Sequence, residues 1–200
     1  MPARLACAAV VLDGGRGRRM GGIDKPGLEL DGRTLRARVV EAVAGADTVL
    51  LVGPPSDEDA ALGRDVVRVR EEPPYGGPLA ALAAAVPHVD RDVMLVLAAD
   101  LVHPDALPAA LLAALDAAPQ AEAAVAVDDA GQRQWLAAAY RTSAVRRALA
   151  SLDGIDGIEG HRFGDLVDLL FAVDVPRADA HDIDTPDDLA RARGAGDTPL

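Results

Sequence analysis

The strongest constraint on the fold is a regular alternation between two kinds of apolar segment. Short runs rich in β-branched residues alternate with stretches in which alanine and leucine recur at helical spacing. This alternation is typical of βαβ units, in which helices connect the strands of a mostly parallel sheet. The sequence therefore predicts an α/β fold.

The same pattern places the individual elements. We expect strands at residues 5–12, 48–53, 66–70, 93–99, 123–127 and 169–175. We expect helices at 34–44, 78–86, 104–117, 142–152 and 186–193, several of which open with Pro or Thr, as helix starts prefer. Residues 135–140 follow a turn sequence and predict a further strand, antiparallel to its neighbours. Length favours a single domain over residues 1–194, followed by a disordered tail at 195–200.

Charge and composition narrow the partners and the compartment. A net charge of -12 argues against binding to nucleic acid, which usually needs a basic face. The longest apolar runs are far shorter than a membrane span, and the N-terminal residues show no export signal. Cys7 is the single cysteine, which suits a reducing compartment. We therefore expect a cytoplasmic protein that binds a nucleotide, not a nucleic acid or a membrane.

A glycine-rich basic segment, residues 11–26, directly follows the first apolar run. Its five glycines allow backbone amides to approach a ligand closely, and its four cations suit a phosphate; the cations are Arg16, Arg18, Arg19 and Lys25. A dinucleotide-binding fingerprint would need a glycine at position 20, whereas the next glycine is Gly21. A Walker A loop would need Gly-Lys-Ser/Thr, whereas Lys25 lies between Asp24 and Pro26. Neither common phosphate motif fits.

The pattern L-x-G-G-x-x-x-R-M-G-x-x-D-K in this segment resembles the signature loop of nucleotidyltransferases, and most closely that of the molybdenum cofactor guanylyltransferases. Four later stretches resemble further family elements; they are Glu71 to Ala80, Ala98 to Asp100, Gln134 to Arg141 and His181 to Leu189. The resemblance implies a three-layer, Rossmann-like nucleotidyltransferase fold with helices on both faces of the sheet. It also implies transfer of GMP from GTP to molybdenum-molybdopterin, with release of pyrophosphate.

The resemblance assigns roles to particular residues. Backbone amides around Gly14 and Gly15 would hold the phosphates, while Arg19 and Lys25 would offset the charge on departing pyrophosphate. The implied catalytic residues are Arg19, Lys25 and Asp100. The implied nucleotide-binding residues are Leu12, Asp13, Gly14, Gly15, Lys25, Gly53, Glu72, Pro78, Leu79 and Asp100. The implied acceptor-binding residues are Trp135, Asp182 and Asp184, and the implied Mg²⁺ ligands are Asp100 and Asp184.

Several alternatives stay open for these residues. Asp100 could instead cap a helix beginning near Pro104, and Asp184 could cap the helix that follows it. Glu72 stands where the family usually has aspartate, and Gly53 stands where it can have a polar residue. Asp13 replaces the usual alanine, and its charge opposes phosphate binding. It could pair with a loop arginine, recognise guanine or suppress turnover; we expect the pairing, with Arg16, Arg18 or Arg19.

The resemblance leaves the function itself with two alternatives. One is a cytidylyltransferase acting on the same cofactor, because base choice depends on a few polar contacts. The other is a nucleotide-binding paralogue without turnover, which Asp13 favours. The implied partners are GTP and the molybdopterin cofactor, together with molybdenum-cofactor delivery proteins or recipient enzymes.

Overall fold

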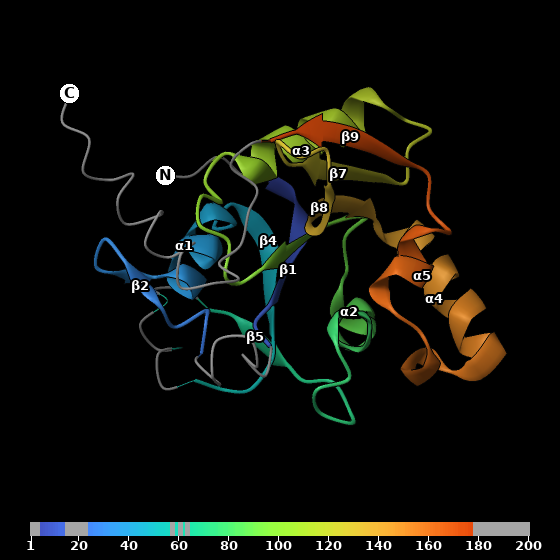
Figure 1. Cartoon of the computed structure of the whole chain (residues 1–200), viewed down its shortest axis with the longest axis horizontal. Helices are drawn as coiled ribbons and strands as arrows, with labels where there is room; N and C mark the ends of the chain where they lie inside the picture. The colour runs from blue at the N-terminus through green and yellow to red at the C-terminus, as the bar shows by residue number, and fades with distance from the viewer. Residues whose placement is uncertain (1–4, 15–23, 57–58, 60–61, 63–64, 178–200) are drawn as a thin grey trace.

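A seven-stranded sheet forms the centre of the computed structural model, which describes residues 5–14, 24–56, 59, 62 and 65–177 (Figure 1). The strand order is β5 (Val67–Val69), β4 (Ala46–Val52), β1 (Leu5–Leu12), β6 (Val93–Ala98), β8 (Arg133–Arg141), β7 (Ala123–Val127) and β9 (Ala172–Pro176). β8 runs antiparallel to both of its neighbours, and the other adjacent pairs are parallel. The predicted mostly parallel sheet is confirmed.

Helices cover both faces of this sheet. One face packs against α2 (Pro78–Ala85), α4 (Thr142–Asp156) and α5 (Phe163–Val167), and the other against α1 (Leu35–Ala42) and α3 (Leu107–Ala117). Successive residues of a strand point to opposite faces. Accordingly, Val10 and Leu12 of β1 belong to the first core, whereas Val11 belongs to the second. Both cores are apolar, which confirms the three-layer architecture.

The order of strands along the chain locates the edge where a ligand would bind. From β1 the chain passes to β4 and then β5 on one side, and returns to form β6 on the other side of β1. The direction of winding therefore reverses between β1 and β6. In open α/β sheets, ligands bind outside the carboxyl ends of the strands at such a reversal.

The observed boundaries differ from the predicted ones in several places. β1 and β7 have the predicted bounds, and the antiparallel strand before α4 is confirmed as β8. β9 begins three residues later than predicted, and α3 begins at Leu107 because residues 104–106 form a turn. Several short elements were not predicted; they are α5, the short turns η3 (Val86–His88) and η4 (Ile158–Gly160), and a hairpin of β2 (Glu29–Leu30) and β3 (Arg33–Thr34).

Two of the predicted segments lie outside the described residues. They are the helix at 186–193 and the tail at 195–200. Within the described part of the chain, none of the helices combines the length and the apolar character needed to cross a membrane.

Candidate active site

The carboxyl ends of β1 and β6 lie side by side and define the candidate active site. Leu12 pairs with Ala98 in the sheet register, and the amide of Ala99 donates to the carbonyl of Leu12 at 3.0 Å. Gly14 follows β1 and is exposed, while Asp100 follows β6 and is half-buried. The fold thus brings the predicted phosphate-binding glycine and the predicted metal ligand to the same edge of the sheet.

Asp100 does not cap the helix that follows it. α3 begins at Leu107, and its N-cap position is Ala106, which makes no side-chain cap. The alternative interpretation, in which Asp100 caps a helix starting near Pro104, is therefore wrong. Because this carboxylate is placed at the ligand edge and is not needed by the helix, its assignment as a metal ligand is the stronger hypothesis.

Lys25 lies in a turn that is attached to the start of α1. The amide of Leu28 donates to the carbonyl of Lys25 at 3.0 Å. The amides of Leu35 and Arg36 donate to the carbonyls of Leu28 and Pro26, at 3.0 and 2.9 Å. These first amides of a helix have no acceptor within the helix. The turn satisfies two of them, and in return the helix fixes the backbone on the carboxyl side of Lys25.

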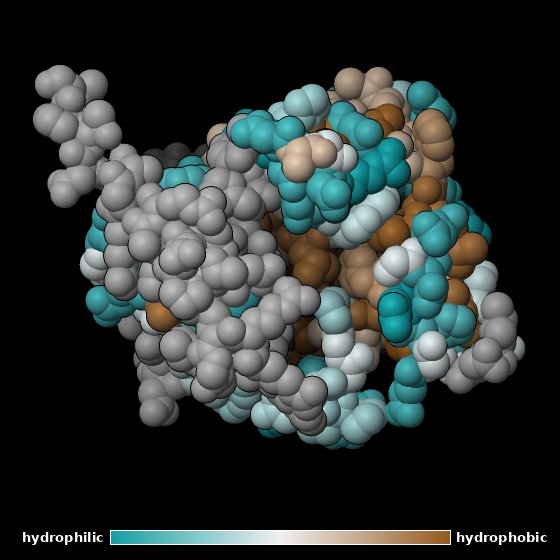
Figure 2. Space-filling view, in the orientation of Figure 1, coloured by the Kyte–Doolittle hydropathy of each residue, from teal (hydrophilic) through white to brown (hydrophobic). Residues whose placement is uncertain are grey.

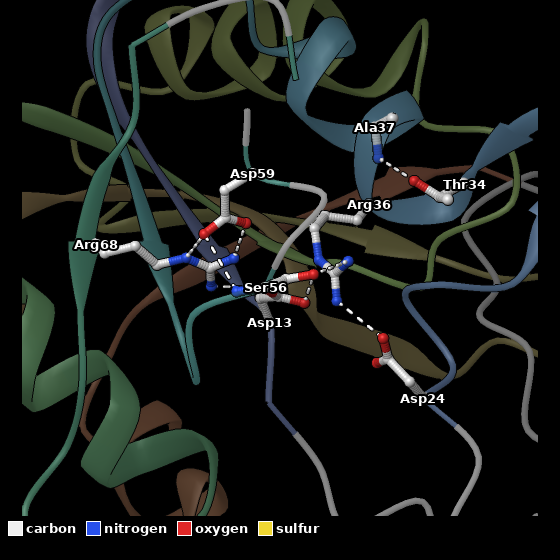
Figure 3. Close-up of polar contacts among 8 residues, drawn as sticks. All are labelled: Asp13, Asp24, Thr34, Arg36, Ala37, Ser56, Asp59 and Arg68. Carbon is white, nitrogen blue, oxygen red and sulfur yellow. Dashed lines mark hydrogen bonds and ion pairs between the residues drawn. The ribbon is translucent and has the colours of Figure 1, made fainter. Parts of the chain in front are cut away.

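Asp13 is buried between two arginines from distant parts of the chain (Figure 3). Its side chain is 1% exposed; Oδ1 accepts from Nε of Arg36 at 2.9 Å and Oδ2 accepts from Nη1 of Arg68 at 2.7 Å. The predicted partners Arg16, Arg18 and Arg19 lie outside the described residues. In the described part of the chain, Arg36 of α1 and Arg68 of β5 supply the cations that neutralise Asp13, and a pairing with the three loop arginines stays a prediction.

The burial of Asp13 also limits what its carboxylate can do. Burial raises the pKa of this carboxyl group, while the charges and hydrogen bonds of Arg36 and Arg68 oppose the rise. A buried carboxylate enclosed by two guanidinium groups is not presented to a nucleotide. Recognition of guanine by the Asp13 side chain is thus contradicted, and only its main chain is left for the predicted nucleotide contact.

The two arginines extend this contact into a chain of ion pairs. Arg68 donates to Asp59 as well as to Asp13, and Nη2 of Arg36 donates to Oδ2 of Asp24 at 3.1 Å (Figure 3). Asp24, Arg36, Asp13, Arg68 and Asp59 therefore form a continuous series, called the ion-pair chain below. It connects Asp13 and Asp24, which lie near the two ends of the glycine-rich segment and are called its flanks below, to α1 and β5.

Gly53 is required by the close approach of two backbone segments. A Cβ atom at this position would lie 1.9 Å from the carbonyl oxygen of Asp13. Next to it, the amide of Asp13 donates to the carbonyl of Val52 at 2.7 Å, and the amide of Gly53 donates to that of Val69 at 3.0 Å. The structure therefore gives Gly53 a packing role, and its predicted contact with the nucleotide stays a prediction.

The other described nucleotide-binding candidates differ in how accessible they are. Glu72 is exposed, and Pro78 is the first residue of α2 and lines the cavity described next. Leu12 and Leu79 are 7% and 2% exposed and belong to the apolar core beneath the site. Their side chains are therefore held within the protein, so any nucleotide contact from these two leucines comes from the backbone.

A cavity of about 270 Å³ opens beside the ends of β6 and α2. It is lined by Pro78, Ala98, Leu101, Arg133, Gln134, Trp135, Leu136, Ala137, Phe163 and Gly164. Figure 2 shows apolar surface at the floor of a hollow on this face, with hydrophilic residues above it. The guanidinium carbon of Arg133 lies 5.3 Å from the centre of the Trp135 ring. The cavity thus combines aromatic surface with a positive charge, next to Asp100 in the fold.

The remaining predicted site residues are not described. Gly15, Arg19, Asp182 and Asp184 all lie outside the described residues. Among the residues that the structure does describe, no group of three or more His, Cys, Asp or Glu side chains could hold a metal ion. The predicted pairing of Asp100 with Asp184 at Mg²⁺ therefore stays a prediction.

Three features of the site were not predicted from the sequence. Arg36 and Arg68 lie far from Asp13 in the sequence, and only the general cost of burying an unpaired carboxylate signalled that distant cations were needed. Arg133 could have been found, since residues two apart on a strand share a face and Trp135 was already a candidate. Phe163 belongs to the short helix α5, which was not predicted.

Comparison with known proteins identifies the family. The family model described as "MobA-like NTP transferase domain" matches residues 9–164, which run from β1 into α5. The chain belongs to this family. The matched MobA-like region includes the glycine-rich segment, Asp100 and every residue that lines the cavity.

Curated relatives of this MobA-like chain match over part of their length. A "Probable molybdenum cofactor guanylyltransferase" of Synechococcus elongatus is 43% identical over 98 residues, which cover 47% of this chain and 50% of the relative. A molybdenum cofactor guanylyltransferase of Shewanella sp. strain ANA-3 is 36% identical over 129 residues, which cover 63% of this chain and 64% of the relative. The matched part of the chain thus spans between half and two thirds of these relatives.

Solved structures share the fold over nearly the whole chain. The molybdopterin-guanine dinucleotide biosynthesis protein A of Archaeoglobus fulgidus has a TM-score of 0.69 at 24% identity, covering 94% of this chain and 98% of that one. A 2-C-methyl-D-erythritol 4-phosphate cytidylyltransferase from Thermus thermophilus also has a TM-score of 0.69, at 20% identity. The match covers 97% of this chain and 100% of that one. At these identities the likeness establishes a common nucleotidyltransferase fold.

Proposed function

We propose that this chain transfers GMP from GTP to molybdopterin carrying molybdenum and releases pyrophosphate. The observation that carries this proposal is the MobA-like match over residues 9–164, which includes the glycine-rich segment and Asp100. The guanylyltransferase relatives support the choice of donor and acceptor. We place the reaction in the cytoplasm, where a buried free thiol such as Cys7 stays reduced.

The reaction needs positioning and charge stabilisation more than a covalent intermediate. A phosphate oxygen of the acceptor attacks the α-phosphorus of GTP, and the bond from that phosphorus to the bridging oxygen breaks as pyrophosphate leaves. Backbone amides at Gly14 and Gly15 hold the β- and γ-phosphates, and Lys25 and Arg19 offset the charge that develops on the leaving group. Glu72 and the start of α2 at Pro78 contribute to binding the nucleoside.

The Asp100 carboxylate at the edge of the sheet fits Mg²⁺, which is commonly bound through one or two protein carboxylates plus substrate phosphates. Asp100 would hold the ion, with Asp184 as the second ligand. Bound there, Mg²⁺ would neutralise phosphate charge and orient the triphosphate. The reactivity of the α-phosphorus then depends on how accurately Gly14, Lys25 and Asp100 hold the phosphates relative to the acceptor.

The cavity beside Trp135 is the proposed site for the acceptor. A planar heterocycle such as a pterin can stack on an aromatic ring, and Arg133 places a positive charge near an acceptor that carries a phosphate. Ala98 at the end of β6 and Pro78 at the start of α2 both line the cavity, so an acceptor seated there lies next to the phosphate-binding edge. Asp182 and Asp184 are proposed to complete this side of the site.

A base-resolved assay tests the proposal. Pyrophosphate release is measured with GTP, CTP or ATP in the presence of Mg²⁺, each with and without molybdenum-loaded molybdopterin. The proposal predicts release with GTP that depends on the acceptor. Greater release with CTP would make the chain a cytidylyltransferase, and nucleotide binding without release from any donor would make it a binding protein. Asp13 no longer favours that last alternative, because its charge is neutralised inside the protein.

A further inference from the structure

Arg36 contacts both flanks of the glycine-rich segment with one guanidinium group. Its Nε donates to Oδ1 of Asp13 at 2.9 Å, and its Nη2 donates to Oδ2 of Asp24 at 3.1 Å (Figure 3). Asp13 directly precedes Gly14, and Asp24 directly precedes Lys25. One side chain on α1 therefore holds the residue before the first phosphate-binding glycine and the residue before the phosphate-binding lysine.

The backbone of Arg36 reinforces this contact. Its amide donates to the carbonyl of Pro26 at 2.9 Å, so the residues on both sides of Lys25 in the sequence are bonded to Arg36. The Arg36 side chain is only 4% exposed, whereas that of Asp24 is 64% exposed. A buried anchor thus fixes an exposed residue, which is the arrangement expected of a support for a binding loop.

The chemistry of this support calls for arginine in particular. Two carboxylates brought to one place repel each other unless a cation lies between them. A guanidinium group is planar and carries donors in fixed directions, so it can bond two carboxylates at once, whereas the single ammonium of lysine acts as a point charge. Arg68 neutralises the other oxygen of Asp13 from β5, but its described bonds go to Asp13 and Asp59 and not to Asp24.

We propose that Arg36 is a positioning residue that sets Lys25 at a fixed place relative to Gly14. This inference rests on the proposed function, because it assumes that both residues hold the same triphosphate. Arg36 itself is enclosed by protein and does not contact the nucleotide. Loss of its bridge lets Asp13 and Asp24 separate, so that they must be brought together again when GTP binds, and affinity falls accordingly.

Arg36→Met and Arg68→Met form a matched pair that tests this role. Both substitutions remove a cation from the buried carboxylate of Asp13, and both are expected to lower the melting temperature. Only Arg36→Met also removes the bond to Asp24. We therefore expect the dissociation constant for GTP to rise about tenfold in Arg36→Met and to stay within about twofold of the parent in Arg68→Met.

Hydrogen exchange at the amide of Leu28 supplies a readout that does not involve nucleotide. This amide bonds to the carbonyl of Lys25, so it reports directly on the turn that Arg36 supports. Faster exchange in Arg36→Met than in Arg68→Met, measured without GTP, is the expected result. Equal exchange and equal GTP affinity in the two variants would overturn the inference, because the ion-pair chain would then stabilise the fold without positioning Lys25.

Arg36→Lys keeps the inference testable if Arg36→Met fails to fold. Lysine retains a positive charge near Asp13 but cannot reproduce the two directed bonds, so this variant is expected to fold and still bind GTP more weakly than Arg68→Met. Lys25→Ala separates failure of the inference from failure of the proposed function. If Lys25→Ala weakens GTP binding and the Arg36 variants do not, the inference alone is wrong. If Arg36→Met speeds exchange but neither it nor Lys25→Ala affects GTP binding, the phosphate assignment is wrong.

Discussion

At the residue scale, the surroundings of a carboxylate decide its role, and Asp13 and Asp100 illustrate the two outcomes. Asp13 is enclosed by Arg36 and Arg68 and serves the structure of the loop. Asp100 lies at the ligand edge and caps no helix. The sequence showed both as acidic residues after buried strands, and it could not distinguish them because the cations come from distant elements. We therefore expect substitution of Asp13 to affect the structure of the loop and substitution of Asp100 to affect metal binding.

Asp100→Asn should remove most Mg²⁺-dependent turnover with little change in stability. Asparagine preserves the shape of the side chain but loses the charge that holds the metal. A bound metal ion stabilises the charge of the transition state by several kcal/mol. We expect turnover with GTP to fall by about two orders of magnitude across a Mg²⁺ titration. Asp105→Asn, at an exposed position in the same connection, serves as the control. Full activity of Asp100→Asn would exclude this residue as a metal ligand.

Cys7 should be unreactive in the folded protein. The thiol lies on β1 with 0% exposure, and burial is the main cause that raises its pKa to about 11, followed by the charge of Asp47. The thiolate is the reactive form, so both access and ionisation are suppressed. A thiol-specific reagent at pH 8 should label the chain only after unfolding in denaturant. Rapid labelling of the native protein would show that β1 is not buried as described.

At the element scale, continuous apolar runs were predicted well and short elements were not. β1 and β7 matched their predicted bounds because each is a buried run bordered by polar or turn residues. The hairpin of β2 and β3 was missed although Asp31-Gly32, with φ of 53° and 75°, is a typical hairpin turn. α5 was missed because five residues carry too little helical periodicity.

Gly53→Ala tests the junction between β1 and β4. The added Cβ would collide with the carbonyl of Asp13 at 1.9 Å, and this backbone is held by hydrogen bonds on both sides. We expect a loss of about 1–3 kcal/mol in the free energy of unfolding. Gly154→Ala is the matched control: in α4 its Cβ would meet nothing within 4 Å, so it should gain about 0.5–1 kcal/mol. Urea denaturation measures both, and a tolerated Gly53→Ala would contradict the described contact.

At the scale of the whole molecule, the fold class and the edge that carries the site could be predicted. The side-chain contacts between distant elements could not. The alternation of apolar runs led to the three-layer architecture, and the segment after the first strand led to the phosphate-binding edge. The ion-pair chain needed the structure, because Asp13, Arg36 and Arg68 meet only when α1 and β5 pack beside β1. Contacts of this kind leave no periodic pattern in a single sequence.

The pH dependence of stability should reflect acidic residues that bind elements together. Glu122 accepts from the amide of Phe171 and pairs with Arg147 of α4; the amide bond is the main cause that lowers its pKa below 4.5. The folded protein therefore takes up this proton at a lower pH than the unfolded chain does. The contribution of Glu122 is fully present above pH 4.5 and is lost as the pH falls through the lowered pKa.

Glu122→Gln measures that contribution. At pH 7 the variant should be less stable than the parent by about 1 kcal/mol, a modest value because Arg147 is mostly exposed. At pH 3 the difference should narrow, since the parent has begun to lose the same charge. Chemical denaturation at the two pH values gives the comparison, with the exposed Glu159→Gln as a control. A difference that is the same at both pH values would show that the charge of Glu122 does not stabilise the fold.

The GTP affinity of Lys25→Ala tests whether the edge beside β1 and β6 binds the triphosphate. A charged hydrogen bond to phosphate contributes about 1.5–3 kcal/mol, so the dissociation constant should rise by about 10- to 100-fold while the melting temperature stays near that of the parent. Arg38→Ala, which loses a cation paired with Asp31 on the same helix–turn unit, should bind GTP like the parent. Parent-like affinity in Lys25→Ala would contradict the phosphate-binding role of this edge.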